Sequence, residues 1–141
     1  MTLDPAKARQ ARDEAALRYQ ALATTYVPEG WTVATRKSLT GRCYMREKRI
    51  EAPVPKTRKS LYIFLHECAH AHLHVGSRKP RHVEEMEAEQ WAHTKMREND
   101  IPVPREMTQR AKAYVAWKIR QAVKRGAKTI NKEALAFAKS R

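Results

Sequence analysis

The sequence predicts an α+β protein in which helices precede and follow one small sheet. Residues 31–55 are rich in strand-forming and turn residues, whereas helical patterns fill residues 4–25 and most of the chain after residue 60. The 141 residues, 42% of them hydrophobic, are enough for one domain with its own core. No run reaches the roughly 18 apolar residues that cross a bilayer, so no membrane association is expected.

The first predicted elements are a charged helix and three strands. Asp4 and Pro5 are a favourable start for a helix that continues to about Thr25. Strands are expected at residues 31–35, 43–45 and 49–52, with short turns between them. We interpret them as a three-stranded antiparallel sheet.

Four more helices are predicted after the sheet. Ser60 is expected to cap a helix that ends near residue 75, and a second should span residues 82–98. The stiff segment 101–104 (Ile-Pro-Val-Pro) then favours a boundary between residues 1–103 and a helical extension over residues 104–141. That extension should hold a long helix at about 106–125 and a short one capped by Asn131, and its apolar positions can pack on the same core.

The charge of the chain is concentrated in this extension. The net charge is +14, and residues 104–141 contribute 11 Lys and Arg against 2 Asp and Glu. Such a segment can contact nucleic acid or an acidic partner, or it can be a solvated face that keeps the protein in solution. The candidate nucleic-acid contacts are Lys112, Lys118, Arg120, Lys124, Arg125 and Lys128.

Cysteine usage and the N-terminus favour a cytoplasmic protein. Cys43 and Cys68 are the two cysteines and form no CxxC pair, so free thiols are expected. The first residues lack the apolar core of a signal peptide.

The segment His66-Glu67-Cys68-Ala69-His70 is an HExxH motif within a predicted helix. Because a helix advances about 100° per residue, His66 and His70 share one face, a turn apart. Two imidazoles placed in this way can bind one zinc ion, and Glu67 lies close enough to that face to act on a water molecule at the metal. The motif therefore predicts zinc-assisted hydrolysis.

A third zinc ligand is expected from the next helix. Glu84 and Glu87 are about 60° apart on one face, whereas Glu85 and Glu89 lie roughly opposite Glu87. We choose Glu87 as the ligand and Glu84 as a carboxylate that orients a ligating histidine. His82 remains the alternative third ligand.

Two other histidines follow the motif. His74 shares the face of His70 but lies about 12 Å along the axis from His66, too far for both to bind one ion. His74 is therefore expected to contact a metal ligand without binding the ion itself, or to be structural. His72 points nearly opposite His70.

The order of sheet, HExxH helix and glutamate helix resembles a small gluzincin, and more narrowly the ImmA/IrrE family of intracellular metallopeptidases. Residues 66–74 are similar to that family's HExxHxxxH motif, and residues 87–92 (Glu-Ala-Glu-Gln-Trp-Ala) are similar to its second motif. The resemblance covers roughly residues 31–95. It implies a minimal zincin-like domain with His66, His70 and Glu87 as ligands and Glu67 as the base. The polar residues 93–97 differ from the apolar segment usual there, and SprT-like proteases, which act near DNA, are a neighbouring possibility.

The predicted function is a zinc endopeptidase that cleaves a regulatory or DNA-associated protein. Glu67 would take a proton from water and pass it to the leaving amine, while Tyr44, His74 or an arginine of the extension would support the carbonyl oxygen. The resemblance to zincins implies that residues 49–52, or the neighbouring strand, would pair with an extended substrate. The alternative is a non-catalytic nucleic-acid-binding module whose zinc only stabilises the fold.

Overall fold

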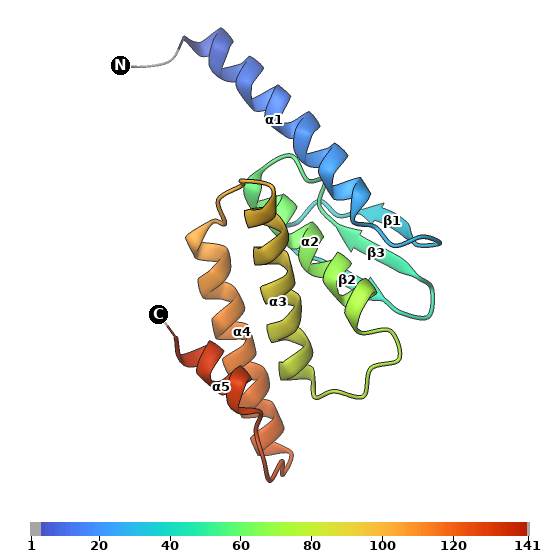
Figure 1. Ribbon diagram of the computed structural model, residues 1–141, viewed down its shortest axis with the longest axis vertical. Helices are drawn as coiled ribbons and strands as arrows, with labels where there is room; N and C mark the ends of the chain where they lie inside the picture. Colours follow the sequence, from blue (N-terminus) through green and yellow to red (C-terminus); the bar gives the residue numbers. More distant parts are fainter. Residues whose placement is uncertain (1–3, 141) are drawn as a thin grey trace.

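Five helices and a three-stranded sheet make up the part of the chain, residues 4–140, that the computed structural model describes (Figure 1). The predicted α+β class is confirmed. Along the chain the elements are α1 (Pro5–Thr25), β1 (Thr32–Thr35), β2 (Arg42–Tyr44), β3 (Arg49–Ala52), α2 (Arg58–Leu73), α3 (Arg81–Glu98), α4 (Arg105–Lys124) and α5 (Lys132–Lys139).

The sheet is mixed, so the prediction of an antiparallel sheet is wrong. Its strand order is β1-β3-β2, with β1 parallel to β3 and β2 antiparallel to it. The central place belongs to β3, whose Ile50 and Ala52 are buried, whereas β1 is largely exposed. Residues 36–41 are long enough to cross two strand spacings of about 4.8 Å each, which leaves room for β3 between the strands they join.

Helix α2 starts earlier than the sequence predicted and has a different cap. Thr57 is the N-cap, and its side chain accepts a hydrogen bond from the backbone N–H of Ser60. Ser60 returns the bond, because its hydroxyl oxygen accepts from the backbone N–H of Thr57. Ser60 is therefore the third helical residue of a capping box.

Helices α2 to α5 are stacked side by side in the order in which they occur along the chain, beginning at the sheet. Helix α2 packs on β2 and β3, α3 packs on α2, α4 on α3, and α5 on α4 (Figure 1). The main core joins the sheet, α2 and the far end of α3, through residues such as Leu61, Leu65 and Met96. A second cluster around Met86, Val115 and Ile119 attaches α4 and α5 to α3.

The buried helix α2 is therefore enclosed between the sheet and α3.

Among the described residues, no helix is both long and apolar enough to cross a membrane.

Candidate metal site

Helix α2 presents two imidazoles toward α3. Apolar residues such as Leu61 and Leu65 form a buried face of this helix. His66 and His70 come later in the same helix and lie one turn apart. The Nε2 atoms of the two histidines are 3.2 Å apart. Both rings therefore direct their Nε2 atoms toward the same position.

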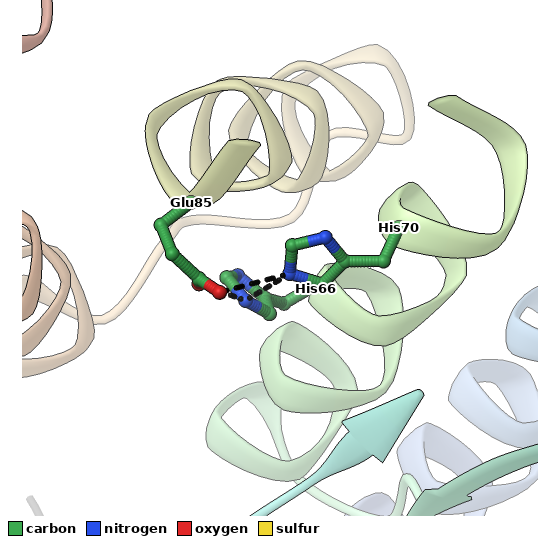
Figure 2. A group of neighbouring side chains, drawn as sticks. All are labelled: His66, His70 and Glu85. Atoms are coloured by element: carbon green, nitrogen blue, oxygen red, sulfur yellow. Dashed lines mark hydrogen bonds and ion pairs between the residues drawn. The ribbon is translucent and has the colours of Figure 1, made fainter. Parts of the chain in front are cut away.

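Glu85 of α3 completes this group (Figure 2). Its Oε2 lies 3.0 Å from His66 Nε2, and its Oε1 lies 3.4 Å from His70 Nε2. One ligand atom from each of the three residues lies within 4.8 Å of the others. His66, His70 and Glu85 can hold a metal ion.

These separations suit tetrahedral coordination. Nitrogen and oxygen ligands at about 2.0–2.1 Å from a tetrahedral zinc ion are about 3.3 Å from one another. The 3.2 Å between the two nitrogens and the 3.0 Å from His66 Nε2 to Glu85 Oε2 are close to that value. The contact of 3.4 Å with His70 Nε2 is made by the other carboxylate oxygen, Oε1. Two histidines and one glutamate also make a donor set typical of catalytic zinc, which keeps its fourth position for water.

The electrostatics of the group favour a neutral His70 and an ionised Glu85, and Glu85 Oε1 also pairs with Arg81 at 3.1 Å. Burial lowers the pKa of His70 to about 4, so this ring is neutral at pH 7 and its lone pair is available. Burial opposes ionisation of Glu85, but hydrogen bonds from His66 and His70 outweigh it and hold its pKa well below the usual range. Burial also disfavours charge on His66, yet Glu85 raises the pKa of this ring. A proton and a metal ion would therefore compete for His66.

A chain of polar contacts fixes the orientation of His70. Its Nδ1 lies 2.8 Å from Nδ1 of the fully buried His74, and His74 Nε2 lies 3.0 Å from Glu87 Oε1. Lys79 Nζ donates to the other oxygen of Glu87 at 2.8 Å. When His70 offers Nε2 to a metal ion, its Nδ1 carries the proton and donates to His74, which in turn donates from Nε2 to Glu87.

Glu89 supports the other imidazole. Its Oε1 is 2.7 Å from His66 Nδ1, although the N–H is not aligned as a full hydrogen bond requires. Burial raises the pKa of Glu89 to about 8. A positive charge shared between His66 and a bound ion would favour its ionised form.

Glu67 borders the same cavity, which measures about 740 Å³ and is also lined by His66, His70 and Glu85. Burial raises the pKa of Glu67, the first requirement of a carboxylate that takes a proton near neutral pH. Gly41 lies directly against it: a Cβ added there would be 2.7 Å from Glu67 Cγ and 2.8 Å from its Oε2. The missing side chain of Gly41 thus leaves the space that Glu67 occupies.

The structure corrects the predicted third ligand. Glu87 is bound to His74 and Lys79, away from the paired Nε2 atoms, and Glu85 stands in its place. The reason is the face by which α3 packs on α2, which carries Glu85 and Glu89 together with Ala92 and Met96, all of them buried. The predicted face, that of Glu87 and Trp91, was wrong by about half a turn.

Three secondary candidates lie elsewhere. His82 is buried but lines a different hollow, between α3 and the end of α4, so it is not the third ligand here. Glu84 pairs with Arg81 and not with a ligating histidine. Tyr44 has the Arg42 and Arg49 guanidinium groups over its ring and its hydroxyl 3.4 Å from Glu51, and it does not line the metal cavity.

The sequence contained a signal for Glu85. Residues 85, 89, 92 and 96 follow helical spacing, and the two apolar members of this row show which face is buried. Gly41, Arg110 and Tyr114, which also line the cavity, had no such signal because they come from distant parts of the chain.

The basic residues of the extension are spread over α4 and the segment after it. Lys118 lies over the rings of Tyr114 and Trp117, and Lys112 over the ring of Phe137. Lys118 and Arg125 line the hollow that contains His82. The exposed members of the set are Arg120, Lys124, Arg125 and Lys128.

Comparison of the chain with protein-family models, curated proteins and solved structures gave no match. The geometry of the site is therefore the basis for its functional interpretation.

Proposed function

We propose that this protein is a zinc-dependent peptidase of the zincin type, with His66, His70 and Glu85 as metal ligands and Glu67 as general base. The observation that carries the proposal is the convergence of ligand atoms from His66, His70 and Glu85, within 4.8 Å of one another, beside a buried carboxylate in an open cavity. A zinc ion held by such a set supplies Lewis acidity and brings the pKa of water down to about 7.

Glu67 has the position and the surroundings for proton transfer. It follows His66 directly on α2 and lines the cavity, and burial is the largest influence on its pKa. In the proposed reaction it takes a proton from the attacking water and later delivers it to the leaving amine.

Arg110 is the proposed partner of the substrate's carbonyl oxygen. It is the one arginine of α4 that lines the cavity, and it takes the role considered for Tyr44, which lies outside. Its guanidinium group would stabilise negative charge that develops on that oxygen.

The proposed substrate path follows β2. Residues 49–52 form the central strand β3 and are paired on both sides, so they have no free edge for a peptide. β2 pairs with β3 on one side only, and residues 40–43 line the cavity. An extended peptide added to β2 would bring its backbone past Glu67.

The test compares Glu85→Gln with its matched control Glu87→Gln, two equal changes on one helix. The full-length protein is stripped with a chelator, and zinc is titrated back against a chromogenic chelator. Glu85→Gln is expected to lose high-affinity zinc binding because a charged ligand is gone, whereas Glu87→Gln should weaken it by about 10–100-fold, as loss of an outer contact does. If Glu85→Gln and the unaltered protein bind zinc with equal affinity, the proposed ligand set is wrong.

Hydrolysis is measured separately with fluorescein-labelled casein and a quenched-peptide library. Glu67→Gln should keep zinc and lose cleavage, because the amide cannot accept the proton. If the unaltered protein binds zinc and cleaves nothing, the non-catalytic alternative with structural zinc is favoured.

A further inference from the structure

The outer side of α4 carries exposed aromatic rings next to cationic groups. Tyr114 is 41% exposed and Trp117 is 44% exposed, and their ring centroids are 5.9 Å apart. Lys118 Nζ lies 5.5 Å from the first centroid and 5.0 Å from the second. The buried side of this helix consists instead of Met107, Ala111, Val115 and Ile119.

These residues belong to one row along the helix. Arg110, Tyr114, Lys118 and Arg125 recur at helical spacing, with Trp117 beside them. We call these five residues the α4 stripe. At 1.5 Å per residue, it extends for roughly 22 Å.

Both ends of the stripe lie at hollows in the surface. Arg110 and Tyr114 line the metal cavity, whereas Lys118 and Arg125 line a second hollow of about 410 Å³ between α4 and the start of α3. Arg81 lines both. The stripe is therefore a path from one hollow to the other.

The second hollow contains polar groups suited to an anion. Lys118 and Arg125 line it, together with Arg81, whose guanidinium is paired with Glu84 and Glu85. It is also lined by His82, which is 3% exposed and whose Nε2 has no hydrogen-bond partner among the described residues. A buried nitrogen without a partner is costly unless a ligand or water satisfies it. The only acidic residue of α4 is Glu106, and its carboxylate pairs with Lys59 at 2.6 Å.

We propose that the α4 stripe binds single-stranded nucleic acid, with bases stacked on Tyr114 and Trp117 and phosphates held by Arg110, Lys118 and Arg125. Aromatic rings beside cations are the usual platform for unpaired bases, because every base has a face that can stack. A duplex covers these faces, so it can use only the cations. An acidic peptide can also use the cations, but its carboxylates offer no flat face to stack on the two exposed rings.

The stripe and the metal cavity meet at Arg110 and Tyr114, which line that cavity. Trp117, Lys118 and Arg125 do not line it, so substitutions at these positions test the stripe apart from the metal site. If the proposed peptidase function is correct, a strand on the stripe would bring proteins bound to it close to the cavity.

The experiment measures fluorescence anisotropy of a labelled oligothymidylate with the full-length protein, with and without zinc, over a range of salt concentrations. Three phosphate contacts on a single strand give a slope of log affinity against log salt of about −2, since each contributes about −0.7. Lys118→Gln should make this slope smaller by about 0.7. The matched control Lys7→Gln removes an equal charge from the exposed start of α1 and should leave it unchanged.

Trp117→Ala should weaken binding by about tenfold with little change in the salt slope, because stacking releases no counterions. Trp117→Phe should keep most of the affinity, which separates loss of a stacking ring from damage to the fold. Unchanged binding by Lys118→Gln and Trp117→Ala would overturn the proposal. So would equal or tighter binding of a duplex of the same length, or displacement of the strand by polyglutamate at equal charge concentration.

Discussion

Gly41→Ala tests how closely the proposed base is positioned. The new Cβ would lie 2.7 Å from Glu67 Cγ and 3.1 Å from its Cδ, whereas ordinary contact begins at 3.4 Å. The backbone at Gly41 and the Glu67 side chain must therefore separate by about 0.7 Å. Gly41 has no positive φ, so the substitution does not place a side chain in the left-handed region.

The expected cost appears in both stability and rate. Overpacking of a buried contact destabilises a protein by about 1–3 kcal/mol. A displacement approaching 1 Å at a reacting group lowers the rate by up to about 100-fold. Zinc affinity should change little, because the three atoms nearest to the new Cβ all belong to Glu67 and none to the proposed ligands.

The assay is a double-mutant cycle with Glu67→Ala, which removes the three atoms nearest to the new Cβ. Urea unfolding should show the loss of about 1–3 kcal/mol for Gly41→Ala in the unaltered protein and almost none in the Glu67→Ala background. Cleavage of labelled casein gives the rate effect. The reasoning is refuted if the destabilisation is the same in both backgrounds, or if Gly41→Ala cleaves as fast as the unaltered protein.

Two further predictions concern titratable groups outside the ligand set. Burial lowers the pKa of His93, whose Nε2 is 3.0 Å from Thr108 Oγ1, so the folded state resists the proton that the unfolded chain accepts below about pH 6.5. Stability should therefore fall as the pH is lowered from 7 to 5, and His93→Gln should lessen that fall in urea unfolding; an unchanged pH dependence would contradict this. Burial, with help from the Glu67 charge, raises the pKa of Cys43 to about 12, so iodoacetamide should modify it slowly at pH 8 and rapidly once the chain is unfolded, as mass spectrometry of the labelled peptide would show.

Local patterns predicted the parts of the site that lie within one helix. The spacing of His66 and His70 was enough to place both imidazoles at one point, because helical geometry fixes neighbours a turn apart. The third ligand depended on how two helices pack. Glu85 and Glu87 differ by two positions, and only the buried row that ends in Ala92 and Met96 decides between them.

The sheet illustrates the same limit. The strands at residues 32–35, 42–44 and 49–52 were predicted within one or two residues, but their order was not. A hairpin between β2 and β3 follows from the short turn between them, whereas the central place of β3 goes with the burial of Ile50 and Ala52. That burial depends on α2, which comes later in the chain.

The three candidate ligands lie between positions 66 and 85, on two helices joined by a short connection. Because few residues separate them, the entropy lost when they come together is small. An ion can therefore join α2 and α3 while the ribosome is still adding the rest of the polypeptide. Acquisition of the metal would then guide the order of folding, and a chain synthesised without it would start from a less constrained pair of helices.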